Sequence, residues 1–224
     1  TKRDDNHLLI NGDPVEITHH ADLNSLDWTP HAPDLVLECS GQIRSRQDAE
    51  IHLHAGAGKV LVSNPADSAV DKTVIFGYNH QDLTAEDRIV SNGSCSTNAL
   101  IPVLSLIDAA FGIEAGVTTT IHSAMSDQPV LDAYHSDLRR TRSAVQSMIP
   151  VDTGLPLGIE RLMPHLQGKI QSLHIRVPTI NVSALDISLQ LTREASAQAV
   201  NELLQSATKG QYSGILGITH EPHA

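Results

Sequence analysis

Short apolar runs in the first part of the chain flank a stretch of helical character. Leu35-Val36-Leu37 and Val60-Leu61-Val62 lie on either side of residues 45–54, and Gly56 and Gly58 follow that stretch. Strand, helix and strand in this order predict a βαβ unit with parallel strands. Further strands are predicted at 73–76 and 88–90. We therefore expect a mainly parallel sheet in the region up to residue 93.

The first apolar segments have a different pattern. Residues 7–10 and 14–17 read as two short strands separated by Asn11-Gly12. Asn-Gly favours the positive φ angles of a two-residue hairpin turn. The pattern predicts a β-hairpin ahead of the parallel sheet and indicates nothing about function.

The second half of the chain changes character. A helix is predicted from Ser94 to Phe111, with Gly112 ending it, and a last amphipathic helix at 196–206. Residues 117–121, 170–177 and 182–191 are long, rich in β-branched residues and partly alternating, which predicts a mixed or antiparallel sheet. The expected fold class is therefore α/β, a parallel sheet followed by an α+β domain.

The amino-acid composition limits the classes of partner and the cellular compartments that we expect for this protein. Fifteen Lys and Arg against 26 Asp and Glu leave a formal charge of −11, so nucleic acid and anionic membrane surfaces are not expected partners. No run of apolar residues is long enough to span a bilayer, and the first residues lack an apolar leader. Two cysteines cannot form a disulfide framework. These features indicate a soluble protein of a reducing compartment, the cytoplasm.

The most specific local motif is Ser91-Asn92-Gly93-Ser94-Cys95-Ser96-Thr97-Asn98, which follows a predicted strand and opens a predicted helix. The unpaired N–H groups at a helix N-terminus stabilise a thiolate, and they can also stabilise an oxyanion on a substrate. Cys95 is therefore a candidate nucleophile. The alternative interpretation is a small buried cysteine beside an N-cap serine.

A nucleophilic cysteine needs a base, and His122 at the end of a β-rich run is the candidate. The chain has 13 histidines, so one near Cys95 is a weak signal, and most are expected at the surface. His52 and His54 are two residues apart and His19 and His20 are adjacent, so neither pair has metal-site spacing. No metal site is expected.

Basic residues gather in Leu138-Arg139-Arg140-Thr141-Arg142, within an otherwise acidic chain. Guanidinium groups in such a cluster can clamp a phosphate or carboxylate through parallel hydrogen bonds. The alternative is a solvated turn paired with Asp132 and Asp137. Arg176 lies in an apolar strand, where a buried arginine requires an anionic partner.

These motifs together resemble the glyceraldehyde-3-phosphate dehydrogenase family, and within it the erythrose-4-phosphate dehydrogenase branch. Residues 91–98 match the family's active-site segment, and His122 follows Cys95 by 122 − 95 = 27 positions, the family's interval. Residues 176–183 match a second family signature. The resemblance implies a partial Rossmann-like dinucleotide-binding domain at 1–93 and a catalytic domain, incomplete at its C-terminal end, at 94–224.

The resemblance also implies roles for individual residues. Cys95 would be the nucleophile, His122 would take its proton, and the cofactor would be NAD. The implied substrate-binding residues are Ser94, Ser96, Arg140, Thr153, Gly154 and Arg176, and the implied cofactor-binding residues are Ser40 and Ser63. A phosphorylated small aldehyde would be the substrate, and the oligomer would be a homotetramer.

The substrate expectation depends on Met125. The family's phosphorylating members have a threonine there, and a thioether cannot donate the hydroxyl's hydrogen bond to phosphate. Met125 and the neighbouring segment 132–142 therefore favour oxidation of D-erythrose 4-phosphate to 4-phosphoerythronate with water as acceptor, a step of pyridoxal phosphate synthesis. The alternative within the family is a phosphorylating glyceraldehyde-3-phosphate dehydrogenase.

The chain also departs from the family pattern. It has no G-x-G-x-x-G segment, and it lacks the family's closing C-terminal segment, so we expect an internal portion of a longer enzyme. Two alternatives of other classes remain open. One is a truncated relative that binds a phosphate ligand or a sister subunit without catalysis. The other is a cofactor-independent cysteine hydrolase.

Overall fold

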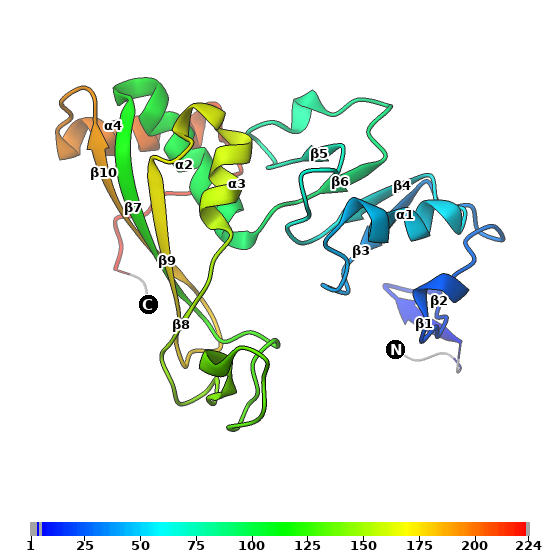
Figure 1. Ribbon diagram of the computed structural model, residues 1–224. Coiled ribbons are helices and arrows are strands. Elements are labelled where there is room, and N and C mark those ends of the chain that lie inside the picture. The colour runs from blue at the N-terminus through cyan, green and yellow to red at the C-terminus, as the bar shows by residue number, and fades with distance from the viewer. Residues whose placement is uncertain (1–3, 5, 223–224) are drawn as a thin grey trace.

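The computed structural model describes residues 4 and 6–222, arranged around three sheets (Figure 1). The strands are β1 (His7–Ile10), β2 (Asp13–Glu16), β3 (Leu35–Glu38), β4 (Lys59–Val62), β5 (Lys72–Thr73), β6 (Ile89–Ser91), β7 (Ile113–His122), β8 (Ile149–Val151), β9 (Ile170–Arg176) and β10 (Ala184–Leu191). The α-helices are α1 (Arg46–His54), α2 (Cys95–Phe111), α3 (Leu155–Leu162) and α4 (Ala197–Lys209). Short 3-10 helices are η1 (Leu23–Ser25), η2 (His80–Asp82), η3 (Leu138–Thr141) and η4 (Pro164–Leu166).

Strands β1 and β2 form the predicted hairpin. They pair antiparallel, with Ile10 opposite Asp13. Asn11 and Gly12 have φ angles of 53° and 97°, the left-handed conformation that this turn requires. The prediction of a hairpin with an Asn-Gly turn is confirmed.

The predicted parallel sheet is present. Its strand order is β3-β4-β6-β5, and all three pairings are parallel. Helix α1 begins where predicted, because the Ser45 hydroxyl accepts the backbone N–H of Asp48 at 3.1 Å. The apolar side of α1 packs with strand residues in a buried cluster, which contains Ile43, Ala49, Val60, Val62, Ala66, Val70 and Ile89.

The strand predicted at 73–76 is wrong beyond Thr73, because β5 ends there. The backbone N–H of Ile75 donates to Asn79 Oδ1 at 2.8 Å, and Asn79 Nδ2 donates to the Thr73 carbonyl at 3.0 Å. These bonds replace a strand ladder with a turn. Ile75 thereby leaves the sheet and enters the core between helices.

The second sheet is mixed, as predicted, with strand order β10-β7-β9-β8. Strands β7 and β9 are parallel, whereas β10 and β8 pair antiparallel with them. The β7–β9 register places His122 opposite Arg176. Two residues that were far apart in sequence therefore meet at one end of the sheet.

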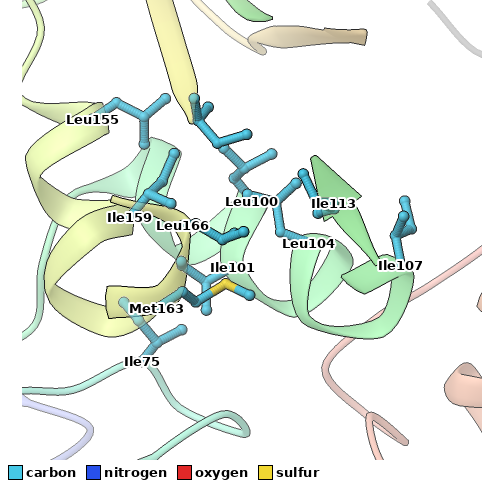
Figure 2. Close-up of a cluster of buried hydrophobic side chains, with 11 residues drawn as sticks. Ile75, Leu100, Ile101, Leu104, Ile107, Ile113, Leu155, Ile159, Met163 and Leu166 are labelled. Atoms are coloured by element: carbon cyan, nitrogen blue, oxygen red, sulfur yellow. The ribbon is translucent and has the colours of Figure 1, made fainter. Parts of the chain in front are cut away.

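Helices α2 and α3 lie between the two larger sheets (Figure 1) and share one core. Figure 2 shows side chains from both helices pointing toward one another, with Ile75 at one edge of the cluster. Burying each aliphatic side chain of this size stabilises the fold by roughly 1.5–3 kcal/mol. The cluster comprises Ile75, Leu100, Ile101, Leu104, Ile107, Ile113, Leu155, Ile159, Met163, Leu166 and Ile170.

Gly158 fixes how closely α3 approaches the first turn of α2. A Cβ added at Gly158 would lie 3.0 Å from Thr97 Oγ1, closer than side chains normally pack. The glycine therefore allows α3 to press against the turn that carries Cys95. No helix within residues 4 and 6–222 is both long and apolar enough to cross a membrane.

Candidate active site

The first turn of α2 presents Cys95. Strand β6 ends at Ser91, and Gly93 turns the chain with a φ of 66°. The Ser94 hydroxyl accepts the N–H of Thr97 at 3.0 Å and so caps the helix. Cys95 is the first residue of the helix and is exposed, whereas Ser96 beside it is buried. The alternative interpretation of Cys95 as a buried structural cysteine is therefore wrong, because the structure leaves it accessible.

His122 lies against this cysteine from the end of β7. Its Nε2 atom is 3.4 Å from Cys95 Sγ, and the histidine is 9% exposed. Its Nδ1 atom lies 2.8 Å from the carbonyl oxygen of Ser123. A carbonyl can only accept, so Nδ1 carries the proton of the neutral ring. The lone pair of Nε2 is left to take the proton of the thiol.

Cys95 and His122 therefore form a nucleophile and base in contact. The thiol also sits at the helix N-terminus, where unpaired N–H groups and the helix dipole favour negative charge. Both features stabilise a thiolate beside an imidazolium. The site can attack an electrophilic carbon, and the same N–H groups can hold the oxyanion that forms.

Two arginines meet next to this pair and share one carboxylate. Arg140 Nη1 lies 2.8 Å from Asp127 Oδ2, and Arg176 Nη1 lies 3.2 Å from Asp127 Oδ1. Arg176 is 7% exposed. Its predicted anionic partner is thus confirmed to be Asp127, a residue that the sequence did not single out.

The other arginines of the basic turn face solvent. Arg139 pairs with Asp137 at 3.2 Å and Asp152 at 2.7 Å, and Arg142 pairs with Asp132 at 3.4 Å. These pairs match the alternative of a solvated turn. Of the three clustered arginines, Arg140 is the one that shares the Asp127 carboxylate with the buried Arg176.

The remaining substrate-binding candidates occupy the start of helices. Thr153 and Gly154 follow β8 and lead into α3, and Thr153 Oγ1 accepts the N–H of Leu155 at 3.2 Å. The Ser96 hydroxyl lies 4.0 Å from Cys95 Sγ. The structure thus brings Ser94 and Ser96 to the cysteine, and their contact with a substrate stays a prediction, as does that of Thr153 and Gly154.

A family model described as glyceraldehyde 3-phosphate dehydrogenase, C-terminal domain, matches residues 94–224, more than half of the chain. The chain belongs to the glyceraldehyde 3-phosphate dehydrogenase family. The matched segment contains Cys95, His122 and the Arg140–Asp127–Arg176 cluster. The observed parallel and mixed sheets are consistent with this family's α/β architecture. Its name indicates an oxidoreductase, and the family generally uses NAD.

The cofactor-binding candidates Ser40 and Ser63 follow two neighbouring parallel strands. Ser40 comes after β3 and Ser63 after β4, and the N–H of Ser63 donates to the Glu38 carbonyl at 3.0 Å. Ligands of open parallel sheets bind beyond the carboxyl ends of strands. The two hydroxyl-bearing loops therefore lie together at the carboxyl edge of the parallel sheet, and their contact with a dinucleotide stays a prediction.

A buried network supports the Ser40 loop, and the sequence did not reveal it. Glu38 Oε1 accepts the Ser40 N–H at 2.7 Å, and Glu38 Oε2 pairs with His52 Nε2 at 2.9 Å. Burial favours the neutral carboxyl, but the bonds from Ser40 and His52 outweigh it, so the pKa of Glu38 lies below its usual value. His52 is an exception to the expectation that most histidines lie at the surface, because it is 3% exposed.

The histidines do not assemble a metal centre in the described part of the chain. Within residues 4 and 6–222, no group of three or more His, Cys, Asp and Glu side chains is placed to hold a metal ion. His174, like His52 and His122, is buried rather than at the surface. His174 lies in β9 and is the second site residue that sequence reasoning missed.

Proposed function

We propose that this chain carries the catalytic site of an NAD-dependent dehydrogenase that oxidises a phosphorylated sugar aldehyde, D-erythrose 4-phosphate, to 4-phosphoerythronate. The observation that carries the proposal is the 3.4 Å contact between Cys95 Sγ and His122 Nε2 at the N-terminus of α2. The membership of the chain in a family of aldehyde-oxidising dehydrogenases supports the same chemistry.

The protein's own residues would handle the protons. His122 takes the thiol proton, and Cys95 adds to the aldehyde carbon, forming a thiohemiacetal whose oxygen receives that proton. When bound, the nicotinamide cofactor supplies the hydride acceptor. His122 removes the hydroxyl proton as the carbon becomes the Cys95 thioester. After His122 releases that proton to solvent, it deprotonates the water that attacks the thioester. The tetrahedral intermediate then expels the Cys95 thiolate, which takes a proton back from His122, and the acid leaves as product.

Charge at the arginine cluster supports water as the acceptor. Arg140 and Arg176 contribute two positive charges and Asp127 one negative charge, which leaves 2 − 1 = +1 for these three residues. Asp137 also lies 3.4 Å from Arg140 Nε, but Arg139 shares that carboxylate at 3.2 Å. Such a cluster suits the single phosphate of the substrate, held by guanidinium N–H groups that Asp127 does not use. A second, inorganic phosphate would face the Asp127 carboxylate, and the thioether of Met125 has no hydrogen-bond donor to offer it.

The cofactor would lie over the loops of Ser40 and Ser63, where neighbouring parallel strands end. On this proposal residues 1–93 are part of a dinucleotide-binding domain and residues 94–224 most of a catalytic domain. The free thiol of Cys95 suits a reducing compartment such as the cytoplasm.

We also propose that the enzyme is a homo-oligomer, a tetramer as the family resemblance implies. One face of the mixed sheet supports this proposal. Val117, Ile121 and Leu173 are 50%, 40% and 46% exposed there, although they are apolar and lie on adjacent strands. Contiguous apolar surface of this kind is typical of subunit interfaces.

The test uses the full-length protein with NAD. We expect NADH formation from D-erythrose 4-phosphate that is faster than from glyceraldehyde 3-phosphate and is not stimulated by inorganic phosphate. Cys95→Ala should abolish it, because no nucleophile remains. Cys39→Ala is the matched control, an exposed cysteine that is not part of the Cys95–His122 pair, and this variant should retain NADH formation.

Two results would contradict the proposal. Activity that survives Cys95→Ala would remove Cys95 from the reaction. Phosphate-dependent oxidation of glyceraldehyde 3-phosphate in preference to erythrose 4-phosphate would assign the alternative, phosphorylating activity instead.

A further inference from the structure

A second histidine lies directly behind the candidate base. His174 is on β9, two residues before Arg176, so both side chains leave the strand on one face. The β7–β9 register places it diagonal to His122. The two imidazole rings stack, with centroids 5.2 Å apart and an interplanar angle of 23°. One face of the His122 ring is therefore covered by His174.

Hydrogen bonding sets the protonation state of His174. Arg176 Nε lies 3.1 Å from His174 Nε2. A guanidinium N–H can only donate, so Nε2 must be the unprotonated nitrogen and the ring must be neutral. His174 is 8% exposed, so no solvent competes for this bond.

The surrounding charges agree with a neutral ring. Burial, together with the repulsion of a positive charge by Arg176, His122 and Arg140, lowers the pKa of His174 to about 4. Asp127 is the one group of this set that opposes the shift. The ring is thus uncharged near neutral pH, whereas His122 gains a proton whenever Cys95 becomes a thiolate.

We propose that His174 is a positioning residue whose neutral ring backs the imidazole of His122 and keeps its Nε2 atom on Cys95. This inference rests on the proposed function, since it concerns the same nucleophile and base. Arg176 holds His174 in place on one side, and His174 supports His122 on the other.

Two physical effects of the stacked His174 ring act on the Cys95–His122 pair. Stacking on a fixed ring restricts rotation of His122 away from the 3.4 Å contact with Cys95. The π face of a neutral ring also favours an adjacent cation, whereas a charged ring would repel the imidazolium. Both effects increase the fraction of Cys95 present as thiolate at a given pH.

Two variants separate the ring from its hydrogen bond. His174→Phe keeps an aromatic face behind His122 and loses the acceptor for Arg176. His174→Gln keeps an acceptor for Arg176 and loses the ring. The readout is the rate of Cys95 alkylation by iodoacetamide from about pH 5 to about pH 9, which follows the thiolate fraction and needs neither aldehyde nor cofactor. His54→Gln, at an exposed position in α1, is the matched control.

We expect His174→Phe and His54→Gln to give the wild-type pH profile. His174→Gln should move the profile to higher pH by about half a unit, which is about a threefold loss of rate on its acid side. The same profile for His174→Gln and wild type would overturn the inference. So would equal shifts in His174→Gln and His174→Phe, because the effect would then follow from disrupting the strand.

A measurement on the unmodified protein covers the case in which a variant does not fold. The imidazole resonances of His174 should show no titration between about pH 7 and about pH 5, because its pKa is about 4. Titration within that range would overturn the inference. If the full-length protein oxidises erythrose 4-phosphate but its His174 variants keep the wild-type alkylation profile, the inference fails and the proposed function stands. If the His174→Gln profile shifts as expected but the protein does not oxidise erythrose 4-phosphate, the proposed function fails and the inference stands.

Discussion

Two buried histidines, His52 in α1 and His122 at the end of β7, carry their protons on different ring nitrogens. Trp28 Nε1 donates to His52 Nδ1 at 3.3 Å, so His52 holds its proton on Nε2 and donates it to Glu38 at 2.9 Å. His122 donates Nδ1–H to the Ser123 carbonyl, and its Nε2 faces Cys95.

The difference lies in what the second nitrogen meets. Both ring nitrogens of His52 have partners within the fold, Trp28 and Glu38, so neither nitrogen is open to a reacting group. The free lone pair of His122 meets the exposed thiol of Cys95. Burial alone therefore does not distinguish a structural histidine from a base. An open lone pair next to an accessible nucleophile does.

The largest expected effect comes from removing the base. In the full-length holoenzyme, His122→Asn should lower turnover by about 10²–10⁴-fold, the usual contribution of a general base. His52→Asn is the matched control, and it should cost stability instead, by about 1–3 kcal/mol, because Glu38 and Trp28 lose a buried partner.

Steady-state kinetics and urea denaturation of both variants check this contrast. A His52→Asn enzyme that folds normally but loses as much turnover as His122→Asn would contradict the contrast between a structural histidine and a base. So would a His122→Asn enzyme with unchanged turnover.

A smaller effect is expected at Glu38. Glu38→Gln leaves one oxygen and one NH₂ group for two buried donors, the Ser40 N–H and the His52 ring, so one donor faces another donor. We expect a loss of about 1–3 kcal/mol in unfolding free energy at pH 7.

This loss should depend on pH in a definite direction. The pKa of Glu38 in the folded protein lies below its ordinary value of 4.5. Its stabilising contribution is therefore present above about pH 4.5 and is lost as pH falls through the folded-state pKa. The stability difference between wild type and Glu38→Gln should shrink over that window in urea titrations. A difference that stays constant would contradict a charged Glu38.

Local signals predicted most of the framework. The cap at Ser94, the stop at Gly112 and the Asn-Gly turn each specify structure through their own residues, and all three are observed. The β-branched residues at 73–76 favour a strand, but the predicted strand is wrong beyond Thr73. The Asn79 side chain forms hydrogen bonds to the backbone of Ile75 and Thr73 and so ends the strand. At this position local side-chain hydrogen bonds to the backbone outweigh the strand propensity of the residues.

The site was predictable only in part. A sequence motif identified Cys95 as a candidate, and the interval from Cys95 to His122 equals the interval between the corresponding residues of a known family. Asp127 and His174 carry no motif, since their roles arise from strand register and from a loop that returns to β9. No spacing rule relates Asp127 to two arginines on different elements. Such residues become visible only when the chain is folded.

The most direct test of the central claim compares the two free cysteines. Cys95 and Cys39 are both exposed, but only Cys95 combines a helix N-terminus with a histidine lone pair. The measurement is the rate of alkylation of each thiol by iodoacetamide at pH 7, resolved by peptide mass spectrometry. We predict that Cys95 reacts at least about tenfold faster and that His122→Asn removes most of this advantage. Equal rates for the two cysteines would contradict the account.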